Sequence, residues 1–334
     1  MTDSSHGNTT DKRMAAVIYN PIKVDLDAIK AAVAREEEAA GWNATRFVPT
    51  SEEDPGQGAA RDALSAGADM VIVAGGDGTV RAVAEIVHDS NAALALVPSG
   101  TGNLLARNLK LVLEDVDQSV HTAFTGVDHP VDVGLIDLRR GNGTQTTHAF
   151  LVMAGLGLDA KMLVNTDEKL KKKVGWLAYV SAITKSLRDK SELHVKYQLD
   201  DGRVHAIRAH TIIIGNCGSL QANVQLLPDA AVDDGFFDIA VLRPEGIVSW
   251  VQVGVKVFWE NGVLHRSKVG RLLATKEVDS LTYVKAKTMA MRLNKADEIE
   301  LDGDSFGKIT ALKTQIKPGA VRIRVPQPEP APAP

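Results

Sequence analysis

The sequence predicts a two-domain protein, with an α/β N-terminal domain built on a parallel sheet and a mostly antiparallel β-sandwich after it. The chain has 334 residues, which is more than one ordinary core requires. Its first part alternates short apolar runs with segments of helical periodicity, a pattern typical of a parallel sheet covered on both faces. After about residue 130 most apolar segments are strand-like, as in a sandwich.

The first part has a regular order of strands and helices. Strands are expected at residues 14–19, 44–48, 70–74 and 92–97, and helices at residues 26–40, 59–66, 80–88 and 101–109. Several of the strand runs are apolar throughout, which indicates strands buried on both faces. We assign residues 13–130 to this α/β domain and expect the polar leader, residues 1–12, to be disordered.

The second part, residues 131–326, is the expected sandwich domain. Its strands are expected at residues 131–138, 146–155, 193–199, 204–214, 237–241, 281–291, 298–301 and 321–325, with helices only at residues 168–187 and 247–259. The tail, residues 327–334, is rich in proline and is expected to be disordered.

Composition excludes several classes of protein. The net charge of -4 argues against non-specific nucleic-acid binding, which needs a basic surface. Cys217 is the only cysteine, so no intrachain disulfide can form and a reducing compartment is indicated. The leader lacks the apolar core of a signal peptide, and no segment approaches about 18 uncharged apolar residues. We therefore expect a cytoplasmic protein whose contact with a membrane is peripheral.

A glycine-rich turn follows the strand at residues 70–74. Its sequence is Gly75-Gly76-Asp77-Gly78-Thr79, and a helix comes next. Such a turn brings backbone N–H groups close to a phosphate, and the helix N-terminus adds a favourable partial charge. Asp77 places a carboxylate in the same turn, where it could hold a metal ion or take a proton. A plain tight turn is the alternative.

A second glycine loop follows the next strand, with the sequence Pro98-Ser99-Gly100-Thr101-Gly102-Asn103. Open α/β sheets bind ligands at the carboxyl ends of their strands, so two such loops can grip a polyphosphate from two sides. Neither loop is a Walker A motif, because no Gly-Lys-Ser/Thr follows, and neither reads GxGxxG.

These loops, together with Asn20-Pro21 after the first strand, resemble the diacylglycerol kinase catalytic family, which includes bacterial lipid kinases and the sphingosine and ceramide kinases. The resemblance covers roughly residues 14–325. Its further motifs are residues 155–160, Gly215-Asn216, residues 228–230, residues 233–238 and Asp302-Gly303-Asp304.

The resemblance implies ATP as the phosphoryl donor, with magnesium. The residues implied to contact the nucleotide are Asn20, Thr50, Gly75, Gly76, Asp77, Gly78, Thr79, Gly100, Thr101 and Asn103. Thr50 rests on spacing alone, and its alternative is a helix N-cap, since Glu53 follows three residues later. Lys23 could approach a phosphate directly or be a solvated lysine.

The resemblance also implies a carboxylate that accepts the proton of the acceptor hydroxyl. We favour Asp304, with Asp302 or Asp77 as alternatives. Alternation would point Asp302 and Asp304 the same way if the strand continued through them. A solvent-exposed Asp-Gly hairpin turn is the structural alternative.

A structural magnesium or calcium ion is implied at Ala231, Asp234 and Phe236, where relatives bind it largely through backbone carbonyls. The alternative is an ordinary acidic turn. One departure concerns Leu104, which stands where many bacterial relatives carry an aspartate in the metal network.

The implied activity is phosphorylation of a hydroxyl on a diacylglycerol-type lipid, giving a phosphatidate-type product. A basic-aromatic segment at residues 169–179 could rest on anionic lipid, or be a solvated helix end with its Trp176 in the core. Edges of the sandwich offer a route to a homodimer. The alternatives are a soluble-substrate kinase such as an NAD kinase or a phosphofructokinase-like enzyme, and a non-catalytic nucleotide sensor.

Overall fold

The computed structural model describes residues 12–99, 102–157, 192–219, 225–243 and 281–328. The helices predicted at residues 168–187 and 247–259, and the basic-aromatic segment, lie outside these ranges. The chain forms two compact units. Unit 1 comprises residues 1–100, 111–129 and 322–334, and unit 2 comprises residues 101–110 and 130–321. Compared with the sequence boundaries, residues 101–110 and residue 130 fall in unit 2, and residues 322–326 fall in unit 1.

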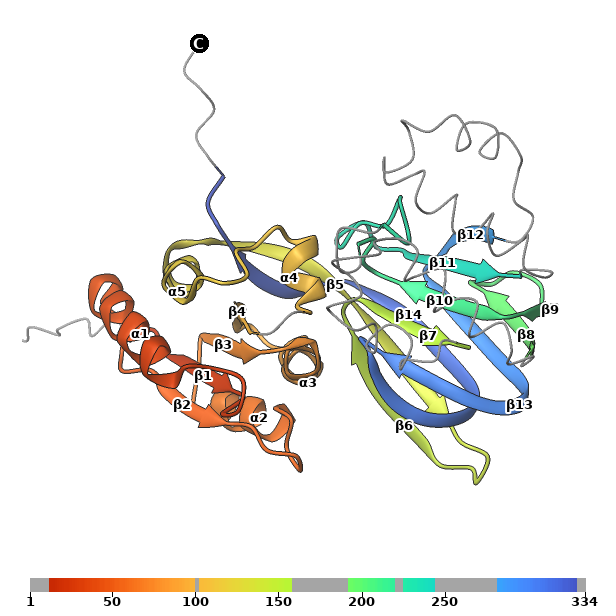
Figure 1. The fold of residues 1–334 in the computed structure, drawn as a ribbon, viewed down its shortest axis with the longest axis horizontal. Coiled ribbons are helices and arrows are strands. Elements are labelled where there is room, and N and C mark those ends of the chain that lie inside the picture. The colour runs from red at the N-terminus through yellow and green to blue at the C-terminus, as the bar shows by residue number, and fades with distance from the viewer. Residues whose placement is uncertain (1–11, 100–101, 158–191, 220–224, 244–280, 329–334) are drawn as a thin grey trace, which may run out of the picture. The chain divides into compact units, whose positions relative to one another are not determined.

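Unit 1 contains a parallel sheet with the strand order β2-β1-β3-β4 (Figure 1). The end of β14 pairs parallel with β4 through Ile323 and Leu94. These strands are β1 (Ala15–Tyr19), β2 (Arg46–Pro49), β3 (Met70–Gly75), β4 (Ala93–Pro98) and β14 (Asp304–Val325). All six residues of β3 are buried, because side chains from both of its faces pack into cores.

Helices cover both faces of this sheet. Side chains of α1 and α5 share one core with alternate residues of β1, β3 and β4, including Val17, Ile72 and Val97. The other pair, α2 and α3, packs together and contacts β1 and β3. The four helices are α1 (Leu26–Ala40), α2 (Gln57–Ser65), α3 (Asp77–Val87) and α5 (Val116–Thr125). Helix α5 was not predicted, although its capping residue Asp115 accepts a hydrogen bond from the Gln118 amide.

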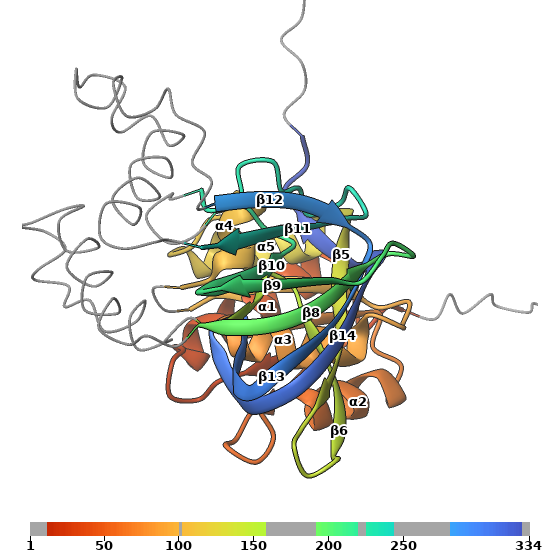
Figure 2. The same ribbon diagram turned by 90° about the vertical axis from the view of Figure 1, so that its right-hand side faces the viewer.

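Unit 2 is an antiparallel β structure (Figure 2). Its strands follow the order β12-β11-β10-β7-β13-β14, with β8 and β9 joined to β13, and β5 and β6 joined to β14. A short helix, α4 (Leu104–Asn108), belongs to the same unit. The remaining strands are β5 (Val127–Arg139), β6 (Gln145–Phe150), β7 (Met153–Leu156), β8 (Leu193–Leu199), β9 (His205–Ala209), β10 (Thr211–Gly215), β11 (Phe237–Leu242), β12 (Leu281–Ala286) and β13 (Thr288–Leu301).

One apolar core joins the strands of unit 2, and the stacked rings of Phe150 and Phe237 lie within it, 5.5 Å apart. The strand predicted at residues 146–155 is two strands, because the chain bends at Leu151 and Val152. The strand predicted at residues 204–214 is likewise divided. The predicted fold class, α/β followed by a mostly antiparallel sandwich, is confirmed. Within the described ranges, no helix is long and apolar enough to cross a membrane.

Candidate active site

The carboxyl ends of the parallel strands in unit 1 bring the predicted nucleotide loops together. The Asn20 amide donates to the Ala74 carbonyl at 2.9 Å, and the Ser99 amide donates to the Gly75 carbonyl at 3.0 Å. The Thr50 amide donates to the Tyr19 carbonyl at 2.8 Å. Residues after β1, β2, β3 and β4 are therefore held at one edge of the sheet by backbone hydrogen bonds.

Gly75 and Gly76 form the turn between β3 and α3. A methyl group at Gly75 would lie 3.0 Å from the Thr79 side chain, so that side chain already occupies the space beside Gly75. A methyl group at Gly76 would lie 3.6 Å from Lys23 Nζ, in ordinary contact. Gly76 is the N-cap and has no side chain, so no side chain caps the start of α3, and the partial positive charge of this helix end favours an anion.

Lys23 lies beside this turn. Its carbonyl accepts a hydrogen bond from the Ser99 hydroxyl, and its amide donates to the Asn20 carbonyl at 3.1 Å. The ammonium therefore faces the position where a phosphate would meet Gly76. The half-buried Asp77, at the first position of α3, belongs to the same edge.

The second glycine loop is described only in part. Gly100 and Thr101 lie outside the described residues, whereas Asn103 is buried in unit 2 with a left-handed φ of 51°. Asn103 is the N-cap of the five-residue helix α4, which is shorter than predicted. Leu104 is the first residue of that helix, so the residue that replaces an aspartate in this chain is part of helical backbone.

Thr50 is not the N-cap of the following helix, so that alternative is wrong. Helix α2 begins at Gln57, and the carboxylate of Asp54 accepts hydrogen bonds from the amides of Gly56, Gly58 and Ala59. Thr50 instead lies buried at the end of β2. Its position next to the end of β1 is consistent with the predicted contact to nucleotide.

Asp302 and Asp304 lie in unit 2 at a two-residue hairpin turn, where Asp302 is the first residue of the turn and Asp304 directly follows it. Leu301 pairs with Asp304, and Asp302 and Gly303 between them have φ values of 49° and 90°. The strand therefore does not continue through Asp302, and the expectation that both side chains point the same way does not hold. Asp302 is only 6% exposed, whereas Asp304 is exposed.

The Asp302 carboxylate binds the backbone that joins β6 and β7. It accepts hydrogen bonds from the amides of Leu151 at 2.8 Å, Val152 at 2.9 Å and Met153 at 2.9 Å. Consecutive N–H groups of this kind form an anion-binding nest, which this carboxylate fills. A carboxylate so engaged is a poorer acceptor for a substrate proton, so Asp302 is the less suited of the predicted proton acceptors to that role.

The predicted metal residues lie in the acidic loop, residues 229–236, which precedes β11. Asp234 Oδ1 accepts a hydrogen bond from the Phe236 amide at 3.0 Å, and Asp234 Oδ2 lies 2.7 Å from Lys285 Nζ. The hydrogen bond to Asp234 raises the pKa of the Lys285 ammonium. Burial raises the pKa of the nearby Asp238 carboxyl, although Lys285 opposes that effect. Both oxygens of the Asp234 carboxylate are thus engaged and its charge is compensated, which does not fit a divalent ion at this carboxylate.

Asp132 was missed by sequence reasoning. It is 1% exposed, and its two carboxylate oxygens accept hydrogen bonds from the amides of Gly235 at 2.6 Å and Gly319 at 2.7 Å. The buried Asn216 donates from Nδ2 to the carbonyls of Asp132 at 2.9 Å and Leu151 at 3.1 Å. The sequence does contain a signal for this residue, because Asp132 stands between two valines of an apolar strand. A carboxylate at such a position is expected to be buried and hydrogen-bonded.

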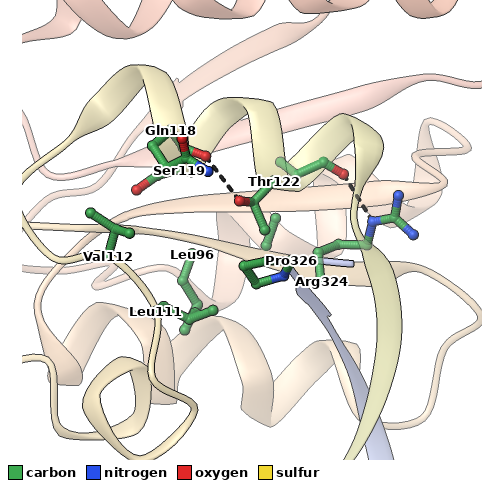
Figure 3. A pocket seen from close by; sticks show the side chains of 10 residues that line it. Leu96, Leu111, Val112, Gln118, Ser119, Thr122, Arg324 and Pro326 are labelled. Carbon is green, nitrogen blue, oxygen red and sulfur yellow. Dashed lines mark hydrogen bonds between the residues drawn. The ribbon is translucent and has the colours of Figure 1, made fainter. Parts of the chain in front are cut away.

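A crevice in unit 1 is lined by residues other than those of the nucleotide loops (Figure 3). It is bounded by apolar side chains such as Leu96 and Val112 and by α5, where the Thr122 hydroxyl donates to the Gln118 carbonyl. Its volume of about 10 Å³ is no larger than one water molecule needs. This crevice therefore cannot hold a nucleotide.

Comparison with known proteins identifies the family. Residues 14–136 match the model described as diacylglycerol kinase catalytic domain, and residues 151–325 match that described as YegS C-terminal NAD kinase beta sandwich-like domain. A "Probable lipid kinase YegS-like" of Pseudomonas fluorescens (strain Pf0-1) is 32% identical over 243 residues, covering 71% of this chain and 74% of the relative. The chain belongs to the diacylglycerol kinase catalytic-domain family. It is thereby a kinase, an enzyme of the transferase class.

Another relative and two solved structures are similar to this chain over most of its length. The "Diacylglycerol kinase" of Bacillus subtilis (strain 168) is 26% identical over 305 residues, covering 89% of this chain and 91% of the relative. A crystal structure of a diacylglycerol kinase from Bacillus anthracis str. Sterne has a TM-score of 0.67 at 24% identity, covering 94% of this chain and 97% of that one. Yeast NADH kinase complexed with NADH has a TM-score of 0.54 at 7% identity, covering 94% and 83%, a likeness of fold alone.

The cap formed by Asp54 gives a pH-dependent prediction. Burial alone would raise the pKa of its carboxyl, but hydrogen bonds from the amides of Gly58, Gly56 and Ala59 outweigh burial and hold the pKa below its ordinary value of 3.8. A depressed pKa adds stability above the ordinary value, and that stability is lost as the pH falls through the lowered pKa.

Asp54→Ala should therefore lower the free energy of unfolding by about 0.5–2 kcal/mol at pH 7, and the difference should shrink on acidification below the ordinary pKa. Asp54→Asn keeps an acceptor oxygen and removes the titration, so it should cost less at pH 7. Urea denaturation at several pH values measures both. A difference between Asp54→Ala and wild type that stays constant with pH would refute the charged cap.

Substitution of each aspartate of the hairpin should distinguish a structural role for Asp302 from a catalytic role for Asp304. Asp302→Asn should lower the free energy of unfolding by about 3 kcal/mol or more, because buried amides lose their acceptor and meet an NH₂ group. Asp304→Asn should change it by less than about 0.5 kcal/mol and lower turnover by about 10²–10⁴-fold if Asp304 accepts the substrate proton. A stable, inactive Asp302→Asn beside an active Asp304→Asn would reverse the assignment.

Proposed function

We propose that this protein is an ATP-dependent lipid kinase that phosphorylates a hydroxyl of a diacylglycerol-type lipid to give a phosphatidate-type product. The observation that carries the proposal is the edge of the parallel sheet in unit 1, where Asn20, Lys23, Gly76 and Ser99 are held around the uncapped start of α3. Family membership supports phosphoryl transfer as the reaction for which this edge is built.

The nucleotide phosphates would bind at the turn of Gly75 and Gly76. Backbone N–H groups at the start of α3 would donate to phosphate oxygens, and the partial positive charge of the helix end would favour them. The ammonium of Lys23 would add a direct charge. Magnesium bound with ATP would neutralise phosphate charge, and Asp77, whose carboxylate lies at the same turn, is the residue that would hold it.

In the reaction, the oxygen of the lipid hydroxyl attacks the γ-phosphorus of ATP. A new oxygen–phosphorus bond forms, the bond between the γ-phosphorus and the β–γ bridging oxygen breaks, and ADP leaves. The hydroxyl proton passes to a carboxylate, for which we propose Asp304 because Asp302 is engaged by three amides. Most of the acceleration in such reactions comes from positioning and electrostatic stabilisation.

Diacylglycerol is the acceptor that the names of the relatives support, since one is called a diacylglycerol kinase and others are called lipid kinases. The lipid would be met at a membrane surface by peripheral contact, from the cytoplasmic side where ATP is available. We also propose that two copies of the chain associate as a homodimer through edge strands of the sandwich.

Phosphorylation of NAD is the alternative from the same superfamily, and the likeness to yeast NADH kinase is the observation behind it. A nucleotide sensor without activity is the alternative from another class. Both are distinguished from the lipid kinase by one assay with several acceptors.

That assay uses radiolabelled ATP with mixed micelles of diacylglycerol, monoacylglycerol, a ceramide or a prenol-type alcohol, and with NAD in solution. We expect label on diacylglycerol, and we expect Asp77→Asn to lower turnover by about 10²-fold or more while the melting temperature is retained. Asp62→Asn, an exposed aspartate on α2, is the matched control and should keep full activity. Transfer to NAD with none to any lipid would overturn the proposal, and no transfer to any acceptor would favour the sensor.

A further inference from the structure

The acidic loop of unit 2 surrounds a positive charge that belongs to the protein itself. Lys285 Nζ lies 2.7 Å from Asp234 Oδ2, 2.9 Å from the Asp229 carbonyl oxygen and 3.3 Å from Asp238 Oδ2. We infer that the ammonium of Lys285 is the structural cation of the acidic loop, and that the loop holds its shape without a divalent metal. The inference is independent of the proposed catalytic activity.

The sheet register fixes this arrangement. Asp238 and Lys285 are directly opposite each other in the antiparallel ladder of β11 and β12. Side chains at such positions are close enough for an ion pair. The Lys285 side chain thus reaches the loop from a neighbouring strand of known register, so its position does not depend on loop flexibility.

Asp238 shows why a cation is needed at this place. Its side chain is 8% exposed, and among the described residues Oδ2 forms no hydrogen bond apart from its ion pair with Lys285. A buried carboxylate without a compensating partner is strongly destabilising. Lys285, whose side chain is 40% exposed, provides the compensating charge.

A divalent ion would compete with this arrangement. Calcium requires six to eight oxygen ligands at about 2.3–2.6 Å, and magnesium requires an octahedron of them. In the loop, Asp234 Oδ1 already accepts the Phe236 amide and Oδ2 already accepts Lys285. A metal at this carboxylate would therefore lie next to an ammonium, and the two positive charges would repel each other.

The loop is also held from its other side. The Asp132 carboxylate accepts the Gly235 amide, and the Asp132 amide donates to the Val232 carbonyl at 2.8 Å. Gly235 has a left-handed φ of 75°, which suits glycine at this turn. The conformation of the loop is thus accounted for by the protein's own hydrogen bonds.

The test is thermal unfolding of the full-length protein without nucleotide, in chelator and then in increasing calcium or magnesium chloride. The readout is the rise in melting temperature that metal induces. Only the part of this rise that is lost when Asp234→Asn is added is counted, because that part comes from metal bound at this loop. The variants are Lys285→Met, its control Lys313→Met on an exposed position of β14, and Lys285→Arg, which keeps a positive charge.

Wild type, Lys313→Met and Lys285→Arg should show no such rise. Lys285→Met should melt at a lower temperature in chelator and recover saturably with calcium, because two carboxylates and a carbonyl are then left without a cation. Lys285→Gln is the second variant if Lys285→Met does not fold. A saturable rise in wild type that Asp234→Asn removes would overturn the inference. Lys285→Met or Lys285→Gln melting like wild type, with no response to metal, would overturn it as well.

Discussion

The candidate nucleotide site depends on how the carboxyl ends of β1, β3 and β4 are joined by backbone hydrogen bonds. The Asn20 amide reaches the end of β3, and the Ser99 amide reaches the Gly75 carbonyl. These bonds fix three loops relative to one another before any ligand arrives. A phosphate that enters meets donors already in place, which limits the entropy lost on binding.

Buried carboxylates in unit 2 are satisfied by the protein itself. Asp302 is bound by three consecutive amides, Asp132 by the amides of Gly235 and Gly319, and Asp238 by the ammonium of a cross-strand lysine. Each arrangement meets the requirement that a buried charge be paired. These carboxylates therefore serve to hold the backbone in place, whereas Asp304, which we propose as the proton acceptor, is exposed.

The fold could be predicted from the sequence because its signals are local. Apolar strand runs and helical periodicity predicted most elements of unit 1 in order, and the glycine turn predicted where a phosphate would bind. Helix α5 was missed because its apolar positions are interrupted by Ser119 and Thr122, whose hydroxyls donate to backbone carbonyls within the helix. Most of β14 was missed because its outward positions are polar, as in Lys313 and Gln315.

The roles of the acidic residues could not be predicted, because they depend on contacts between distant parts of the chain. Asp302 finds its amides about 150 positions earlier, and Lys285 finds Asp234 51 positions earlier. A motif shows which residue types are present, but not whether their lone pairs are already used. Thr50 illustrates the same limit, since the cap that its spacing suggested is supplied by Asp54.

The most direct test of the phosphate site is ATP binding by Gly76→Ala, measured by calorimetry. Gly76 has an ordinary φ of -95°, and a methyl group there would meet nothing closer than Lys23 Nζ at 3.6 Å, so the fold should accept the substitution. The methyl group would, however, occupy the space where the phosphate approaches. We predict an unchanged melting temperature without nucleotide and an ATP affinity lowered by about tenfold or more, equivalent to at least about 1.4 kcal/mol. Wild-type affinity in this variant would contradict the account.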